Sequence, residues 1–147
     1  MIRKYQCKKD RSFGIFLMIS ELIIIAVAYC PMLFDTYSFT ELIISSLIVI
    51  LVSGLFLRIW FGTYYIIDDE ILIAISGPLK WRIPIHEIAF IRLNQRTIGG
   101  TWKPTLSWDS IEIRYRKSKS IFITPDNQTE FLSDLKKINN EIVIKPK

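Results

Sequence analysis

Two long apolar runs occupy the first part of the chain, and only four residues separate them. Residues 12–34 contain a single charged side chain, Glu21, and residues 39–61 carry their charges near the two ends. A helix needs roughly 20 mainly apolar residues to cross the hydrocarbon core of a bilayer. Since both runs are long enough and the link between them is a short polar turn, the pattern predicts a transmembrane helical hairpin over residues 12–61.

The charges that flank this hairpin predict its orientation. Residues 1–11 hold five basic residues and one acidic residue, the turn holds no basic residue, and Arg58 lies at the far end of the second run. Lys and Arg concentrate on the cytoplasmic side of membrane helices. We therefore expect a multi-pass membrane protein with both termini in the cytoplasm and residues 1–11 as a basic tail. The aromatic residues expected at the inner interface are Trp60, Phe61, Tyr64 and Tyr65.

The first apolar run also has features of a secretory signal peptide. It has a basic start, an apolar centre and the small-residue sequence Ala26-Val27-Ala28. Glu21 interrupts that apolar centre and a second apolar run follows almost at once, which favours an uncleaved hairpin. Cleavage is the alternative, and in both cases the second helix leaves the C-terminal domain in the cytoplasm.

Glu21 is an ionisable group inside the first apolar run. Such a group is costly within a bilayer and usually faces a partner or a cavity. A simple antiparallel register places Glu21 level with Ser53, and Gly54 beside Ser53 permits close approach. Our hypothesis is a hydrogen bond between Glu21 and Ser53 inside the hairpin, with Glu21 protonated. The alternative is a proton or ion pathway, which requires an oligomer because two helices cannot line a pore.

From Gly62 onward the chain changes to short β-rich runs separated by turn residues, which predicts six or seven strands. Pro84 cannot donate a ladder hydrogen bond, so the run that contains it is predicted at a sheet edge or a bulge. In residues 110–116, apolar and charged residues alternate, which predicts one buried face and one face in water. The strand candidates are residues 63–67, 71–76, 81–85, 88–94, 110–116 and 120–124.

An amphipathic helix is predicted after the last of these runs. Either Asp126 or Asn127 can cap it, and its apolar stripe consists of Phe131, Leu135 and Ile138. That stripe must be buried on the sheet, so residues 62–147 are predicted to form an α+β domain in which one amphipathic helix caps six or seven consecutive strands.

Four stretches of this domain resemble the YyaB-like bacterial PH-domain family, and the resemblance covers roughly residues 62–140. They are Tyr65–Asp69 (YIIDD), Ile83–Ile85 (IPI) followed by Ile88, Leu106–Tyr115 (LSWDSIEIRY) and Ile123–Pro125 (ITP) leading to Phe131. Ser110 departs from the family, where Arg is expected. The resemblance implies a PH-like β-sandwich or barrel of six to seven strands capped by a C-terminal α-helix and anchored in a bacterial membrane by N-terminal helices. It implies no reaction, and some related membrane proteins act as immunity factors against bacteriocins.

Composition changes this picture little. Half of the residues are hydrophobic and the net charge is +5, but membrane orientation accounts for most of the positive surplus, so nucleic acid is not an expected partner. His86 is the only histidine and falls at a predicted turn, and Cys7 and Cys30 have no metal-type spacing. We find no nucleophile, base or metal pattern, so the sequence predicts no catalytic residues, no metal and no cofactor.

Basic residues of the β domain are the remaining candidates for function. Near an anionic leaflet each Lys or Arg adds about 1 kcal/mol of attraction, although a solvated charged face is the simpler alternative. We hypothesise a non-catalytic interaction module at the inner face of a bacterial cytoplasmic membrane, binding a protein partner or lipid headgroups. The alternatives are protection against a membrane-active peptide or bacteriocin, and a small oligomeric transport component. The candidate contacts are Arg92, Arg96, Trp102, Lys103, Lys117 and Lys119.

Overall fold

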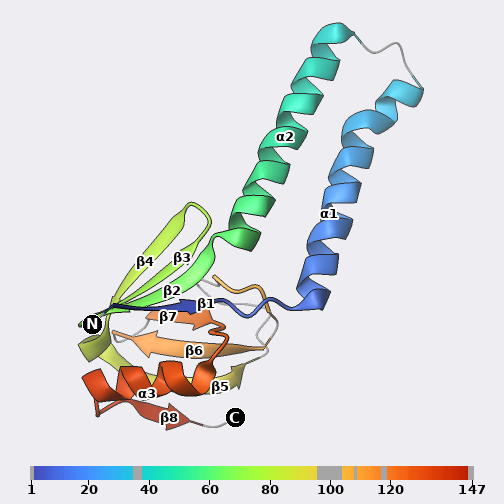
Figure 1. The fold of residues 1–147 in the computed structure, drawn as a ribbon. Helices are drawn as coiled ribbons and strands as arrows, with labels where there is room; N and C mark the ends of the chain where they lie inside the picture. Colours follow the sequence, from blue (N-terminus) through green and yellow to red (C-terminus); the bar gives the residue numbers. More distant parts are fainter. Residues whose placement is uncertain (1, 35–37, 96–103, 108, 117–118, 146–147) are drawn as a thin grey trace.

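The structure of the protein is a computed structural model, and it describes residues 2–34, 38–95, 104–107, 109–116 and 119–145. A long helical hairpin rises from one end of a β domain, and the two chain ends both lie in the β domain (Figure 1). The predicted α+β fold is confirmed: two long apolar helices precede a β-sandwich of two sheets that a C-terminal helix covers.

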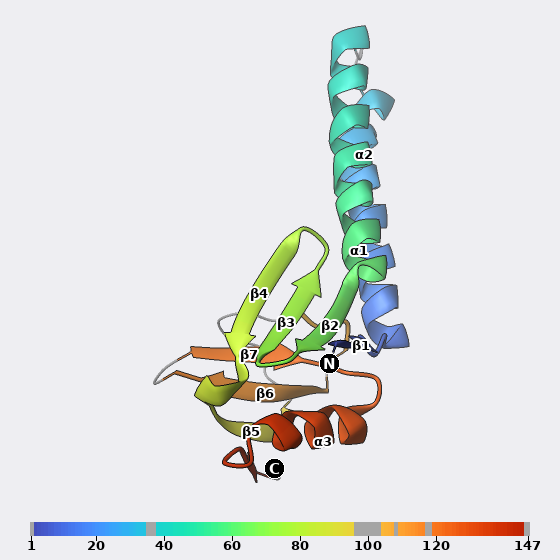
Figure 2. The same ribbon diagram turned by 60° about the vertical axis from the view of Figure 1, so that its left-hand side comes forward.

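The hairpin consists of α1 (Arg11–Tyr29), a 3₁₀ turn η1 (Cys30–Leu33) and α2 (Phe39–Phe61). The two helices run side by side (Figure 2), and each is long and apolar enough to cross a membrane. The α2 helix begins at a capping box, in which the Ser38 hydroxyl accepts a bond from the Glu41 backbone N–H and the Glu41 carboxylate accepts one from the Ser38 N–H.

The first sheet contains residues 2–6, which belong to the segment that the charge pattern predicts to be a tail. Strand β1 pairs antiparallel with β2, with Arg3 opposite Ile67 and Tyr5 opposite Tyr65. The hairpin is thus inserted between two paired strands of one sheet, and the prediction of a separate basic tail is corrected. The dense positive charge hid an alternating pattern, because Tyr5 and Cys7 are both buried. The sheet order is β1 (Ile2–Gln6), β2 (Thr63–Asp68), β3 (Ile71–Ser76) and β4 (Leu79–Pro84).

The second sheet has the order β7-β6-β5-β8, and helix α3 (Gln128–Ile138) lies beside it. A 3₁₀ turn, η2 (Ile85–Glu87), joins the two sheets. The described residues therefore form eight strands rather than six or seven, since β1 and the three-residue β8 carry no strand signal of their own. The strands of this sheet are β5 (Ile88–Gln95), β6 (Ser110–Tyr115), β7 (Lys119–Ile123) and β8 (Val143–Lys145).

Tyr65 lies in the core between the sheets and is fully buried, so its predicted place in an interfacial aromatic belt is wrong. Its hydroxyl donates to the Pro104 carbonyl at 2.7 Å and accepts from the Thr124 N–H at 3.1 Å. Burial raises the pKa of Tyr65 well above its ordinary value, because the phenolate would lose its hydration. The core thus holds a satisfied polar group that ties β2 to the end of β7.

Several local predictions are confirmed, and two need correction. The strand that ends at Pro84 lies at a sheet edge. Asn127 caps α3 by accepting from the Glu130 N–H. Of the apolar stripe of α3, Ile138 is 41% exposed while the other two members are buried. Glu112, predicted to face water, is only 8% exposed, so this face of β6 is partly covered.

Candidate functional site

Arg92 lies on β5 in a cluster of positive charges around one aromatic ring. Arg92, Arg114 and Lys145 come from three neighbouring strands, and their charged groups lie 5.0, 5.6 and 4.6 Å from the centre of the Phe90 ring. Arg92 also pairs with Glu112 at 3.5 Å. One of the three charges is thus already compensated, and the other two stay close to a half-buried ring, an arrangement that suits an anionic partner.

The other sequence-predicted contacts are not brought into this cluster. Lys119 begins β7, is exposed, and lies opposite Tyr115. Four of the six predicted contacts fall outside the described residues: Arg96, Trp102, Lys103 and Lys117. The sequence prediction did not include Phe90 and Arg114. Each lies next to a strand residue whose buried or exposed side follows from the alternation of apolar and polar residues, and this signal could have placed both side chains. Lys145 had no such signal, since only the parallel pairing of β8 with β5 places it there.

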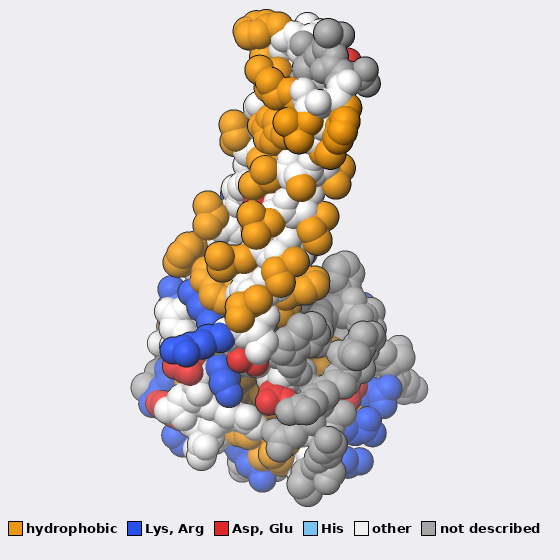
Figure 3. Space-filling model, turned by 90° about the vertical axis from the view of Figure 1, so that its right-hand side faces the viewer, with side chains coloured by type: hydrophobic (Ala, Val, Ile, Leu, Met, Phe, Trp, Pro, Cys, Tyr) orange, Lys and Arg blue, Asp and Glu red, His pale blue; other side chains and the backbone are white. Residues whose placement is uncertain are grey.

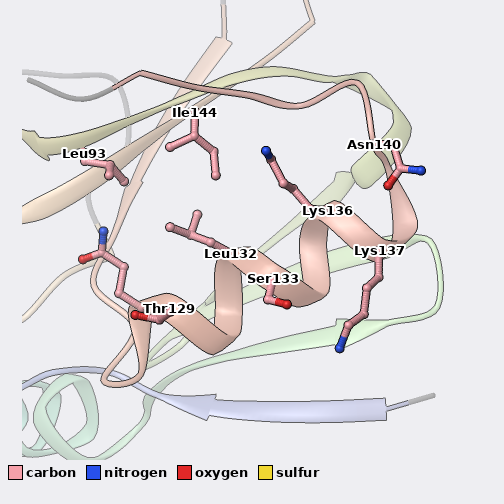
Figure 4. A pocket seen from close by; sticks show the side chains of 9 residues that line it. Leu93, Thr129, Leu132, Ser133, Lys136, Lys137, Asn140 and Ile144 are labelled. Carbon is pink, nitrogen blue, oxygen red and sulfur yellow. The ribbon is translucent and has the colours of Figure 1, made fainter.

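A groove of about 830 Å³ lies between α3 and the β5–β8 edge (Figure 4). Its floor is apolar, because the side chains of Leu93, Leu132 and Ile144 approach one another there. Lys136 extends over the groove toward Ile144. The rest of the lining is polar: Gln128, Thr129, Ser133, Lys137 and Asn140. An apolar floor with a few polar groups around it is the general character of a ligand-binding site.

A polar cluster next to this groove ties β1 to α3. The Tyr5 hydroxyl donates to an Asp134 carboxylate oxygen at 2.5 Å, and Arg3 and Lys137 donate at 2.7 and 3.0 Å. The bond from Tyr5, together with the two cations, holds the pKa of Asp134 below its usual value. Burial and the same bond raise the pKa of Tyr5 to about 12. This cluster is structural, since each polar group in it is directed at another.

Inside the hairpin, the Ser53 hydroxyl donates to Oε1 of Glu21, the pair that the helix register predicted. A second polar contact joins the helices, with the Tyr29 and Ser46 hydroxyls 2.9 Å apart. The other Glu21 oxygen, Oε2, is buried and has no hydrogen-bond partner among the described residues. A cavity of about 490 Å³ adjoins the pair and is otherwise lined mainly by apolar side chains such as Leu17, Phe56 and Trp60.

The base of the hairpin carries basic side chains. Figure 3 shows hydrophobic side chains along the hairpin and Lys and Arg gathered where it meets the β domain. The Lys9 ammonium lies 5.6 Å from the Trp60 ring and 4.9 Å from the Phe61 ring. Trp60 also packs against the core of the β domain. Aromatic and basic groups therefore meet where a membrane helix would leave the bilayer.

The described part of the chain holds no group of three or more His, Cys, Asp or Glu side chains placed so that they could hold a metal ion. His86 is exposed in the η2 turn, and its neighbour Glu87 is paired with Arg116, whose Nε lies 2.5 Å away. Two packed sheets covered by a C-terminal helix are the architecture of a PH-like fold.

Comparison with known proteins gives the family. Residues 63–139 match the family described as bacterial PH domain, which covers the chain from β2 through α3. The chain belongs to this family. The matched range leaves out β1, the strand that lies before the hairpin insertion. No curated protein and no solved structure shows significant similarity to the chain.

Proposed function

We propose that this protein is a membrane-anchored, non-catalytic interaction module at the inner face of a bacterial cytoplasmic membrane, and that its PH-like domain binds a protein partner in the groove between α3 and β8. The observation that carries the proposal is the position of this groove. Both α3 and β8 lie at the end of the domain opposite the hairpin (Figure 1). When the hairpin spans the bilayer, the groove is held away from the membrane and open to a soluble partner.

The orientation follows from the basic side chains at the hairpin base. Both chain ends belong to the β domain, so they lie on the same side of the membrane. Positive residues favour the cytoplasmic side, and Lys8, Lys9, Arg11 and Arg58 all lie where the helices meet the domain. Both termini are then cytoplasmic, and the turn between the helices faces outward. We also infer that the chain belongs to the YyaB-like group of bacterial PH-domain proteins.

The partner expected in the groove is a protein segment with apolar side chains and at least one carboxylate. The apolar side chains match the floor of Leu93, Leu132 and Ile144, and the carboxylate matches Lys136. A lipid is a poorer match, because the groove is on the far side of the domain from the helices. PH-like domains in general bind proteins or lipids, and the groove position favours a protein here.

Site-directed photocrosslinking of the full-length protein in its membrane tests this proposal. Benzoylphenylalanine replaces Leu132 in the groove, or the exposed His86 as a control. We expect an adduct of defined mass only at position 132, weakened by Lys136→Glu in the same chain. Equal adducts at the two positions, or an adduct at 132 that does not respond to the charge reversal, would contradict the groove as the binding site.

The cavity inside the hairpin favours a second candidate function, protection against a membrane-active peptide. Glu21 lines that cavity, and its buried Oε2, which has no partner among the described residues, is the atom that would accept a hydrogen bond from an inserted peptide. Resistance measured in a peptide-sensitive strain tests this candidate. Resistance that survives Lys136→Glu but not Glu21→Leu would support it, while resistance unaffected by Glu21→Leu would exclude the cavity as the contact.

A further inference from the structure

The turn between β3 and β4 lies against the last turn of helix α2. The Gly77 N–H donates to the Gly62 carbonyl at 3.2 Å. A Cβ on Gly77 would lie 3.0 Å from Cγ1 and 3.4 Å from Cα of Ile59, so the turn backbone touches the helix directly. Gly77 has φ of +57°, a conformation that glycine adopts at little cost. Only glycine combines this backbone with such a close approach.

Side-chain bonds fix the same junction. The Thr63 hydroxyl donates to the Ile59 carbonyl at 2.6 Å and lies 3.1 Å from the Ser76 hydroxyl. Thr63 and Ser76 are both buried and lie opposite each other in the β2–β3 ladder. The end of α2, the start of β2 and the end of β3 are therefore joined by direct contacts, which hold the β3–β4 turn against the helix.

This contact sets the depth of the turn relative to a membrane. Ile59 lies inside the apolar run 39–61, two residues or about 3 Å before the end of α2. A turn that touches Ile59 is therefore level with the last part of the spanning segment. Figures 1 and 2 both show the β3–β4 turn rising beside the base of α2.

The residues of this turn have the chemistry of a membrane interface. Pro78 is exposed and Leu79 is 51% exposed, which is unusual for an apolar pair at the tip of a hairpin. Lys80 and Arg82 follow, both exposed, on the outer face of the sheet. Strand geometry places them about 3 and 10 Å from Leu79 along β4. That interval spans the headgroup layer, which is roughly 5–8 Å thick on each side of a bilayer.

The neighbouring strand adds apolar surface on the same face. Lys80 lies opposite Ile75 and Arg82 lies opposite Ile73, and both isoleucines are only half-buried. Apolar side chains with Lys and Arg beside them are typical of surfaces that sit at the boundary of headgroups and acyl chains. The opposite turn of the same sheet, Asp69-Glu70, is acidic and exposed.

We propose that the β3–β4 turn is a third membrane contact of this protein. Leu79 enters the boundary between headgroups and acyl chains, and Lys80 and Arg82 bind the phosphates of anionic phospholipids. The inference rests on the proposed function in one respect, that the hairpin spans the membrane. This third contact gives the β domain a fixed orientation relative to the membrane. The sheet edge at β4 lies on the leaflet, and the α3–β8 groove faces away from it.

Depth-dependent quenching of fluorescent probes tests this contact in the full-length protein. The Cys30→Ser chain is labelled at Leu79→Cys and reconstituted in phosphatidylcholine–phosphatidylglycerol vesicles; the buried Cys7 is retained. Spin-labelled lipids quench a probe according to its depth. We expect quenching at position 79 by shallow spin labels and none at Ile71→Cys, an exposed residue at the other end of β3. An unquenched probe at position 79 overturns the inference.

A third probe separates this inference from the proposed function. Ile50 is exposed at the middle of α2, so the Ile50→Cys probe reports whether the hairpin spans the bilayer. Deep quenching at position 50 with none at position 79 overturns only the third contact. No quenching at position 50 overturns the membrane-spanning hairpin itself, and with it the premise of both proposals.

Charge variants test the lipid chemistry. Two basic residues add about 2 kcal/mol of attraction to an anionic leaflet. The double variant Lys80→Gln, Arg82→Gln should therefore weaken binding of the β3–β4 turn to the vesicle surface about 30-fold, which lowers quenching at position 79. Vesicles of phosphatidylcholine alone should have the same effect. The control Lys119→Gln removes an exposed positive charge at the start of β7, outside the β3–β4 turn, and should leave quenching unchanged. Quenching at position 79 that is unchanged both in the Lys80→Gln, Arg82→Gln variant and in phosphatidylcholine vesicles overturns headgroup recognition.

Discussion

The hairpin and the β domain are stabilised in opposite ways, although they share one chain and one junction. None of the residues of α1 and α2 is buried, and side chains such as Leu47 and Leu51 are more than half exposed. In the β domain, Tyr65, Phe131 and Ile113 are fully buried. For the proposed membrane hairpin a bilayer would take the place of a core, while the domain removes its own apolar surface from water.

Polar contacts differ between the two regions in the same sense. The hairpin has isolated pairs, Tyr29 with Ser46 and Glu21 with Ser53, within an apolar surrounding. The domain has a cluster in which several donors converge on one carboxylate, Asp134. Loss of a domain contact should therefore unfold part of a cooperative unit, whereas loss of a hairpin contact should change only local helix association.

The largest expected effect comes from breaking the strand that precedes the hairpin. Tyr5 is buried and its ring packs edge-on against Phe131 with centroids 5.1 Å apart. Tyr5→Ala should therefore lower the free energy of unfolding of the β domain by about 3–5 kcal/mol, as for other large aromatic truncations. Chemical denaturation in detergent measures it. Gln6→Ala, an exposed neighbour on the same strand, should stay within about 0.5 kcal/mol, and a Tyr5 effect of that size would contradict the inserted topology.

A smaller effect, with a defined pH dependence, is expected at Asp134. Its pKa is lower in the folded state because the carboxylate accepts from Tyr5 and pairs with Lys137 and Arg3. A lowered folded-state pKa stabilises fully above the unfolded value near 4, and the contribution is lost as pH falls through the folded value. Asp134→Asn should cost about 1.5–3 kcal/mol at neutral pH.

Urea unfolding of both chains across the acidic range checks this prediction. The difference in stability between wild type and Asp134→Asn should shrink below about pH 4, where the wild-type carboxylate takes up a proton. A difference in stability that stays constant across the acidic range would contradict the ionised role of Asp134.

Tyr5 should give a pH dependence at the alkaline end. Its pKa is raised to about 12 in the folded state, so its contribution to stability is present below about pH 10 and is lost as pH rises through about 12.

The cap of α3 should have an intermediate effect within the domain. Asn127 accepts from the Glu130 N–H and donates from its amide to the Glu130 carboxylate at 2.8 Å. Asn127→Ala should lower the free energy of unfolding by about 1 kcal/mol, which thermal denaturation can detect. Asp126→Ala is the matched control, because the sequence allowed either residue as the cap. A larger loss of stability in Asp126→Ala than in Asn127→Ala would contradict Asn127 as the cap of α3.

The smallest effect is expected inside the hairpin. Interhelical hydrogen bonds in membranes contribute about 0.6 kcal/mol on average, so a double-mutant cycle of Glu21→Ala and Ser53→Ala should give a coupling energy of that order. Helix-association measurements in bicelles suit this magnitude. Tyr29→Phe tests the second pair in the same way. A coupling near zero would mean that the two side chains are neighbours without a stabilising bond.

Sequence alone was sufficient for features whose signal is local. The hairpin follows from two apolar runs of membrane-spanning length, the β2–β3 turn from Asp69-Glu70, and the start of α3 from Asn127. Periodicity, turn chemistry and caps act over a few residues, so the chain states them directly. The edge position of the strand with Pro84 belongs to the same group, since a missing N–H excludes a central strand.

Tertiary structure alone decided the features that depend on pairing across long separations. Ile2–Gln6 became a strand only because Thr63–Asp68 offers it an edge, and the intervening hairpin brings the two together. The cations around Phe90 required the register of three strands, and the α3–β8 groove required the return of the chain after the helix. The depth of the Gly77 turn beside Ile59 likewise has no local signal. Local preference fixed the hairpin helices, α3 and most of the strands, while non-local pairing fixed β1, β8 and the arrangement of side chains on the surfaces of the domain.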